Sequence, residues 1–289
     1  MTVPTRSDFV RVRGLRYHVK VTGDAGKPML WLLPGWLDTA ATWAPVAEAL
    51  ARYFQVHCPD WRGVGHSEWP QDGYWFYDYV ADLDALLAHY TPEKPILLVG
   101  HSMGAQVASL YAGLRPQRVS KLACLDGLFL PDMGPELAPK RFSKWLDELR
   151  DEASELRSYS SFEALALRVR KQHPQLSDEK ALFVAKAWGY TDGHGKVRLL
   201  ADPKHYRSGP GLYRVTESLE IWKQITAPTL FLDAGKSLFG KAINAEEKAR
   251  RRACFATRQE QIITEAGHML HFDAPEVTAR ALADFLTTP

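Results

Sequence analysis

The chain has 289 residues, of which 46% are hydrophobic and 24% are charged, so it can bury a full core and is not a disordered protein. Its 36 Lys and Arg against 34 Asp and Glu leave a formal charge of +2, which is too balanced to suggest a nucleic-acid or anionic-membrane partner. Three widely spaced cysteines argue against a disulfide framework and a zinc site, and they favour a reducing compartment.

The sequence also carries no signal for membrane targeting. The stretch MTVPTRSDFV has no basic segment that leads into an apolar one, and no later stretch approaches the roughly 20 apolar residues of a spanning helix. We therefore expect a soluble, cytoplasmic monomer or homodimer that acts on a small-molecule substrate and needs no cofactor or metal.

Short apolar runs alternate with amphipathic runs along most of the chain. The expected strands are 15–21, 29–33, 54–58, 96–99, 119–125, 229–233 and 261–264. The expected helices are 42–52, 77–89, 106–114 and 275–286. Strands separated by helices predict a mostly parallel sheet that is covered on both faces.

The middle of the chain, from about residue 129 to 221, has a different character. Helical periodicity covers 136–157, 162–172 and 177–188, and Asp192-Gly193 is typical of a hairpin turn. We expect a core formed by 1–130 and 221–289, and a mainly helical cap formed by 131–220. A side domain with no gating role is the alternative, but the many aromatic residues of the insertion favour a lid.

The motif Gly-His-Ser-Met-Gly lies between an apolar run and a helical run of small residues. Gly100, Ser102 and Gly104 fit the pattern G-x-S-x-G, in which a strained turn holds a serine between a strand and a helix. A side chain at either glycine would collide with the neighbouring strand or helix. The motif predicts that Ser102 is a nucleophile above a helix N-terminus, rather than part of an ordinary glycine-rich turn.

A serine nucleophile needs a base and an acid that orients the base. His268, in a loop before the last helix, is the predicted base, and His271 in the same loop is the better candidate for a packing role. Asp126 and Asp233 each end an apolar strand. Both are candidates for the acid, and both could instead be capping residues.

The reaction also needs donors for a negatively charged oxygen. The backbone amide of Met103, directly after the nucleophile, is one expected donor. The other is the amide of Trp36, because Pro34-Gly35 bends the chain after an apolar strand and exposes that amide. Because both donors are backbone groups, the side chains at these positions only shape the pocket.

These segments together resemble the α/β-hydrolase superfamily in order and spacing over residues 11–130 and 221–289. The resemblance is carried by LLPGWLDTAATW, PDWRGVGHS, VGHSMGAQVA, KLACLDGLFLP and EAGHMLHFDAPE. The segments LDGLFLP and TDGHGKVRLLADPKHYR resemble the serine-hydrolase-like (Kraken-type) group. The resemblance implies an α/β fold, a mostly parallel doubly wound sheet with a mainly helical cap inserted after the sixth core strand.

The sequence departs from the family pattern at two places. Pro34 stands where the family usually has a histidine, so a side-chain hydrogen bond that braces the oxyanion loop is lost while the backbone donor remains. Many relatives carry the acid in a Gly-Glu-x-Asp turn, but this chain reads DAGKSLF, with Ser237 near the expected position. Since Asp233 lies too early, this departure moves the predicted acid to Asp126.

The resemblance implies a serine hydrolase with the triad Ser102, His268 and Asp126 and an acyl-enzyme intermediate. The substrate would be an ester, thioester, amide or carbon–carbon bond compound. It would lie in an apolar pocket lined by Trp36, Phe129 and Trp188. A serine nucleophile argues against haloalkane dehalogenases and epoxide hydrolases of this fold, which use an aspartate at this position.

A second class is the cofactor-independent quinolone dioxygenases, which share the fold and use the His–Asp pair as a base. The chain resembles them at PGW, at WRG and at Asp126, but its region near Asp38 lacks their histidines. We rank this alternative below a hydrolase. A non-catalytic binding protein is a third class, and the presence of both Ser102 and His268 argues against it.

Overall fold

A central sheet of eight strands organises the computed structural model, which describes residues 3–150 and 157–288. The strand order is β1-β2-β4-β3-β5-β6-β9-β10. The first three strands in this order pair antiparallel, and all later neighbours pair parallel. The predicted, mostly parallel sheet is confirmed.

The elements follow one another as strand and helix along the core. The strands are β1 (Thr5–Val12), β2 (Leu15–Thr22), β3 (Met29–Leu33), β4 (Gln55–Pro59), β5 (Ile96–His101), β6 (Val119–Leu125), β7 (Gly189–Thr191), β8 (Val197–Leu199), β9 (Thr229–Ala234) and β10 (Arg258–Ile263). The α-helices are α1 (Ala44–Leu50), α2 (Phe76–Tyr90), α3 (Met103–Leu114), α4 (Ala138–Arg150), α5 (Phe162–Gln172), α6 (Asp178–Trp188), α7 (Val215–Trp222), α8 (Ala245–Arg252), α9 (Leu270–Asp273) and α10 (Pro275–Thr287). Short 3₁₀ helices include Ala40–Trp43 before α1 and Phe239–Lys241 after β9.

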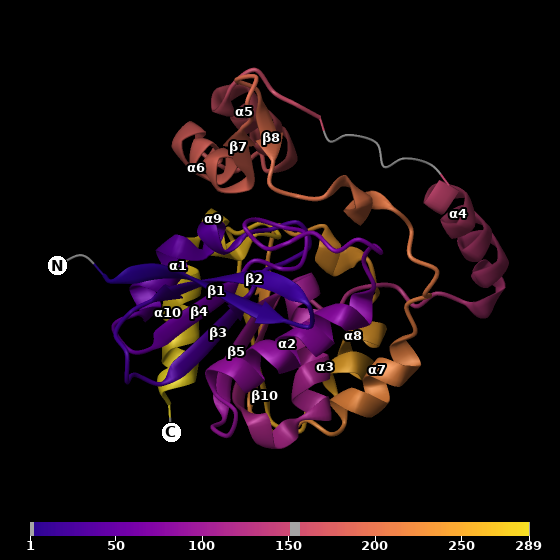
Figure 1. Cartoon of the computed structure of the whole chain (residues 1–289). Coiled ribbons are helices and arrows are strands. Elements are labelled where there is room, and N and C mark those ends of the chain that lie inside the picture. The colour runs from indigo at the N-terminus through magenta and orange to yellow at the C-terminus, as the bar shows by residue number, and fades with distance from the viewer. Residues whose placement is uncertain (1–2, 151–156, 289) are drawn as a thin grey trace.

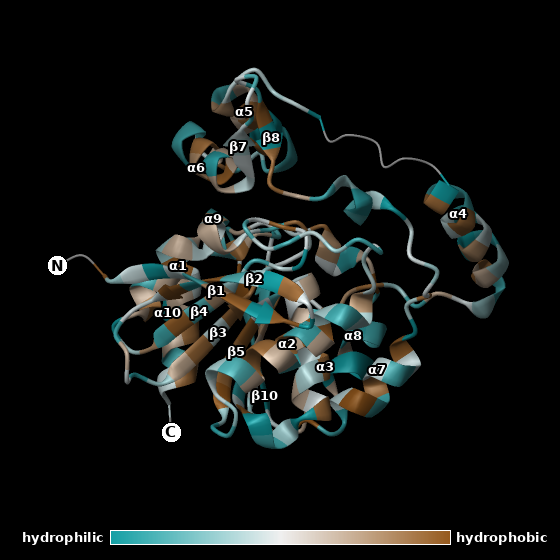
Figure 2. Ribbon diagram, viewed as in Figure 1, coloured by the Kyte–Doolittle hydropathy of each residue, from teal (hydrophilic) through white to brown (hydrophobic). Residues whose placement is uncertain are grey.

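Two apolar layers form because successive strand residues point to opposite faces of the sheet. In β3, Leu30 and Leu32 pack with α1 and α10, whereas Trp31 and Leu33 pack with α2, α3 and α7. All four side chains are fully buried. Figure 2 shows the hydrophobic residues gathered on the central strands, with hydrophilic residues on the outer turns of the helices.

The inserted segment leaves the sheet after β6 and returns at β9. Helices α5 and α6 and the β7–β8 hairpin lie together over one end of the sheet, and α4 lies apart from them (Figure 1). The hairpin turns at residues 192–196, where the sequence predicted it. The last part of the helix predicted at 136–157 lies outside the described residues.

The inserted helices pack on the core near α9. Buried residues of α5 and α6 form an apolar cluster with Met269 and Phe272. The division into core and cap remains a proposal. Helix α7 crosses its expected boundary at residue 220 and packs on α3, so we place α7 with the core. Among residues 3–150 and 157–288, no helix combines the length and apolarity that crossing a bilayer requires.

Candidate active site

Ser102 lies in a sharp turn between β5 and α3. Its backbone has φ 53° and ψ −116°, a strained combination for a residue with a side chain. A Cβ on Gly100 would lie 2.2 Å from the Gly104 carbonyl oxygen, and one on Gly104 would lie 2.2 Å from the Leu33 oxygen. The two glycines therefore allow α3 to begin directly against the strands and present Ser102 at the carboxyl end of β5.

A connected row of hydrogen bonds joins three distant segments of the chain. His268 Nε2 lies 3.0 Å from Ser102 Oγ, and His268 Nδ1 lies 2.6 Å from Asp126 Oδ2. Asp126 is 1% exposed, while Ser102 and His268 are half-buried. The geometry matches a nucleophile, a base and an orienting acid.

The Asp126 carboxylate has two further donors from the segment after β9. The Ala234 amide donates to Oδ1 at 3.2 Å, and the Ser237 hydroxyl donates to Oδ2 at 2.5 Å. Ser237 thus lies where many relatives carry an acid, and in this chain it contacts Asp126, the predicted acid. It was noted in the sequence as a departure, but its hydrogen bond to Asp126 was not predicted.

Asp233, the rival acid, is engaged elsewhere. Its carboxylate binds Lys248 Nζ at 2.6 Å and Arg252 Nη2 at 2.6 Å. Both cations lie on α8, the helix that follows β9. The structure therefore gives Asp233 an ion-pairing role and places Asp126, not Asp233, beside His268.

The two expected oxyanion donors flank the serine. Among the described residues, neither the Trp36 amide nor the Met103 amide has a hydrogen-bond acceptor. Gly35 approaches so closely that a Cβ there would lie 3.3 Å from Ser102 Cβ. The Trp61 indole donates to the Pro34 carbonyl oxygen at 2.9 Å. This buried tryptophan therefore braces the turn, in which Pro34 replaces the histidine that is usual in the family.

A cavity of about 490 Å³ opens above Ser102. This volume is within the range of small-molecule sites. Its wall consists of Gly35, Trp36, Phe76, His101, Ser102, Met103, Gln106, Leu128, Leu130, Phe239, His268 and Met269. Trp36 lines the cavity as expected.

Two expected lining residues lie elsewhere. Phe129 is 1% exposed and packs against Phe239 behind the wall, and its neighbours Leu128 and Leu130 line the cavity instead. Trp188 lines a second, adjoining cavity. Sequence reasoning missed Phe239, whose ring lies 4.9 Å from that of His268; no periodic pattern marks it, because it follows the end of β9.

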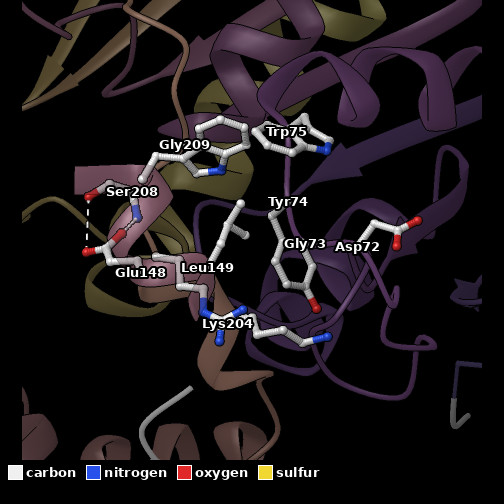
Figure 3. Close-up of a pocket in the computed structure, with 11 residues that line it drawn as sticks. Asp72, Gly73, Tyr74, Trp75, Glu148, Leu149, Lys204, Ser208 and Gly209 are labelled. Carbon is white, nitrogen blue, oxygen red and sulfur yellow. Dashed lines mark hydrogen bonds between the residues drawn. The ribbon is translucent and has the colours of Figure 1, made fainter. Parts of the chain in front are cut away.

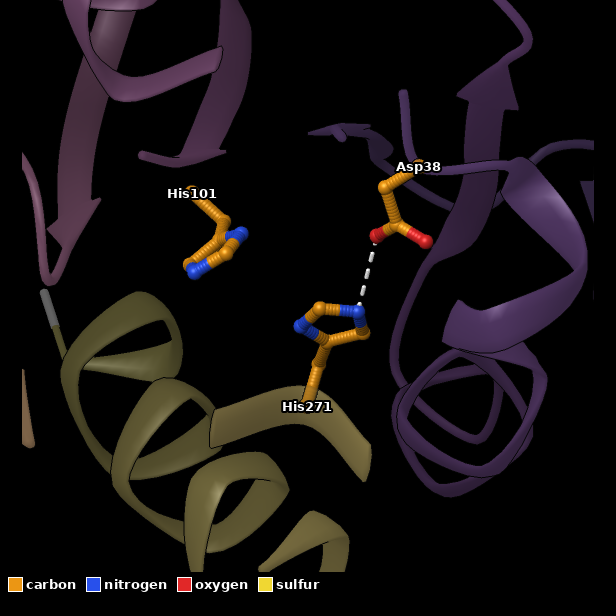
Figure 4. A group of neighbouring side chains, drawn as sticks. All are labelled: Asp38, His101 and His271. Atoms are coloured by element: carbon orange, nitrogen blue, oxygen red, sulfur yellow. Dashed lines mark ion pairs between the residues drawn. The ribbon is translucent and has the colours of Figure 1, made fainter. Parts of the chain in front are cut away.

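Below the site lies a buried cluster of Asp38, His101 and His271 (Figure 4). His271 Nε2 lies 2.9 Å from Asp38 Oδ2, and the Trp188 indole donates to Asp38 Oδ1 at 2.8 Å. His101 donates through Nε2 to the His268 carbonyl oxygen at 2.7 Å, and burial lowers the pKa of His101 well below its usual value.

The ligand atoms of this cluster lie within 4.8 Å of one another, close enough to hold a metal ion. The contacts of these residues also have a structural task, although Asp38 Oδ2, His101 Nδ1 and His271 Nδ1 have no hydrogen-bond partner among the described residues. These contacts tie the loop of His268 to the turn after β3 and to the end of α6. As the sequence suggested, His271 has a packing role, with its ring stacked on Trp43.

Another hollow lies between α4 and the loop at residues 72–75 (Figure 3). Its volume is about 30 Å³, and its wall contains none of the three residues of the hydrogen-bonded row. A space of this size holds about one water molecule. It is therefore too small to be the substrate site.

The fold and the serine turn define a class of protein, and the comparison with family models names that class. The model described as "alpha/beta hydrolase fold" matches residues 28–275. The chain belongs to this family and is a hydrolase of the α/β fold. The expected fold class and family are confirmed.

Similar proteins include several hydrolases. A serine hydrolase-like protein of Danio rerio is 28% identical over 274 residues, covering 90% of this chain and 82% of that protein. N-formylmaleamate deformylase of Pseudomonas putida is 27% identical over 289 residues, covering 97% and 96%. The thioesterase domain from the curacin biosynthetic pathway has a TM-score of 0.85 and 25% identity, and the match covers 99% of this chain and 100% of that one.

Proposed function

We propose that the protein is a serine hydrolase that cleaves small, largely apolar esters, or related thioesters and carbon–carbon bonds, through an acyl-enzyme. The observation that carries this proposal is the row Asp126–His268–Ser102, with distances of 2.6 and 3.0 Å, on the floor of an apolar cavity. The relatives named as a deformylase and a thioesterase are consistent with attack on an acyl carbon.

The proposed reaction has two halves. Ser102 Oγ attacks the ester carbonyl while His268 Nε2 takes the hydroxyl proton, and the amides of Trp36 and Met103 bind the negative oxygen. The carbon–oxygen bond to the alcohol breaks, and His268 returns the proton to the leaving alcohol. Water, activated by His268, then cleaves the acyl-enzyme and releases the acid.

Each neighbouring group supports one part of this reaction. Asp126 holds the imidazole so that Nε2 faces the serine, and Ser237 and the Ala234 amide hold Asp126. The apolar wall excludes water from the reacting carbonyl, which strengthens the hydrogen bonds to the oxyanion.

The test is covalent labelling and turnover of graded esters. A fluorophosphonate should label the wild-type protein, and p-nitrophenyl esters of increasing acyl length should be hydrolysed. The Ser102→Ala variant should lose the label and at least about a thousandfold in kcat. Ser158→Ala, which changes an exposed serine, is the matched control and should behave as the wild type.

Two outcomes would contradict the proposal. Ester turnover that survives Ser102→Ala would exclude the acyl-serine. Oxygen consumption with a hydroxyquinolone, retained in Ser102→Ala, would instead favour the dioxygenase alternative. We also propose that the protein is a cytoplasmic monomer or homodimer whose only partner is its substrate. The three free cysteines are consistent with a cytoplasmic location.

A further inference from the structure

A second cavity adjoins the one above Ser102. Its volume is about 290 Å³, and it shares Trp36 and Met269 with the first cavity. The rest of its wall comes largely from α5, the end of α6 and the segment at 199–206. Trp36 belongs to both walls, and its ring packs edge-on against Tyr206, with 5.3 Å between ring centres.

The second cavity carries a positive charge, and no acidic side chain is present among its described lining residues. Arg168 is the one Lys or Arg among these described residues. His173 also lines it, and burial lowers the pKa of His173, which disfavours the charged form of this ring.

Arg168 is available to a ligand. Its side chain is exposed, and it makes no ion pair or hydrogen bond within residues 3–150 and 157–288. The neighbouring Arg170 on the same helix differs, because it pairs with Asp178. Tyr206 lines the same cavity as Arg168.

The two cavities therefore suit the two ends of one molecule. The wall above Ser102 is mainly apolar, and it suits the chain that bears the reacting carbonyl. The second wall adds a guanidinium group, a phenol and the Gln172 amide, which are all hydrogen-bond donors. An arginine binds a carboxylate through two parallel hydrogen bonds, which a neutral ester group cannot form.

We propose that the second cavity binds the carboxylate of the substrate through Arg168, so that the preferred substrate is a monoester of a dicarboxylic acid or a compound of that form. This inference rests on the proposed function, because it assumes that the ester carbonyl lies at Ser102. The length of chain that joins carbonyl and carboxylate is then a property that the enzyme selects.

The test compares two series of esters that differ only in charge. The first series is mono-p-nitrophenyl esters of dicarboxylic acids from succinate to suberate, and the second has the free carboxylate converted to its methyl ester. At one chain length, the wild type should show at least a tenfold higher kcat/KM for the carboxylate. Arg168→Gln should remove most of this preference and leave the methyl series unchanged, and Arg168→Lys should keep part of it.

Arg170→Gln is the matched control, since it removes a cation from the same helix outside the cavity wall, and it should keep the preference. Equal rates for both series in the wild type, or an equal fall for both in Arg168→Gln, would overturn the inference while the hydrolase remained. Failure of the proposed function looks different, because neither series would then depend on Ser102. Turnover of the methyl series also reports that each variant is folded.

Discussion

Asp126 shows how one residue can be held by two parts of a chain. It follows β6, yet two of its hydrogen-bond donors, the Ala234 amide and the Ser237 hydroxyl, come from the end of β9 and beyond. With His268 these donors engage both carboxylate oxygens in a buried site. Several hydrogen-bond donors hold a buried carboxylate in one orientation.

At this scale the two strand-end aspartates should respond differently to the same change. Asp126→Asn should lower kcat by about a thousandfold to ten-thousandfold, because an amide does not hold His268 in the required tautomer. Asp233→Asn should leave kcat nearly unchanged and lower the free energy of unfolding by about 1–3 kcal/mol, because Lys248 and Arg252 lose their anion. Ester kinetics and urea unfolding of both variants measure this. An equal loss of kcat in both variants would contradict the assignment.

The sequence predicted the residues that come together at Ser102, but only part of the wall around them, namely Trp36. The G-x-S-x-G motif identified Ser102, and the position of His268 before the last helix identified the base. Asp126 was chosen because it ends a strand and because DAGKSLF lacks the usual acid. Phe129 was expected in the pocket and is buried behind it. The reason is that Asp126 and Leu128 have φ of 40° and 66°, so the alternation of a strand does not continue into this segment.

Among the elements, the turn from β5 into α3 depends most on small residues. The start of α3 lies against the end of β3, since a Cβ at Gly104 would meet the carbonyl oxygens of Leu33 and Pro34 at 2.2 and 2.6 Å. Backbone atoms cannot rotate away as a flexible side chain can. A larger residue there must displace the helix and, with it, the Met103 amide.

Gly104→Ala should therefore lower the free energy of unfolding by about 1–3 kcal/mol and reduce ester turnover more than tenfold. Gly193→Ala is the control, because an added Cβ there would meet no heavy atom of the described residues within 4 Å. We expect it to change stability by no more than about 0.5 kcal/mol. Urea unfolding and ester kinetics decide; a Gly104→Ala variant as stable and active as Gly193→Ala would show that the turn tolerates a side chain.

Most core elements could be predicted because the central strands are apolar on both faces and most core helices bury one apolar face. The strands β3 and β6 have the predicted bounds, and α5 in the insertion does too. The strand β1 and the helix α8 were missed because they are mostly polar. Helix α8 is stabilised by its Asn244 cap and by Glu247, which pairs with two arginines, so capping and charge spacing were the signals to use.

For the whole molecule, buried histidines make stability depend on pH. His57 on β4 is 1% exposed and stacks on Trp31 at 5.2 Å. Burial lowers the pKa of His57 to about 4, whereas the unfolded chain binds this proton near pH 6.5. The contribution of His57 to stability is therefore fully present above pH 6.5 and decreases as the pH falls toward 4.

The free energy of unfolding should then be lower at pH 5 than at pH 8, and His57 alone should account for about 2 kcal/mol of the difference. In His57→Gln the difference between the two pH values should shrink by that amount. Urea unfolding at both pH values measures it. The free energy of unfolding of the variant at pH 8 reports the packing that the substitution removes. If the difference between pH 8 and pH 5 were the same in the wild type and the variant, the proposed role of His57 would be excluded.

The neighbours β6 and β9 pair in register up to Leu125 and Leu232, and the whole insertion leaves and re-enters the sheet between them. The two ends of the insertion lie side by side, because the Met133 amide donates to the Tyr213 carbonyl oxygen at 3.0 Å and the Val215 amide donates to Asp132 Oδ1 at 2.7 Å. A segment of almost any length can therefore be grafted there at little entropic cost. The insertion supplies Arg168 and most of the wall of the second cavity, and the core supplies the serine, the histidine and the aspartate. Exchanging insertions between members of this family is thus a route to new selectivity with unchanged chemistry.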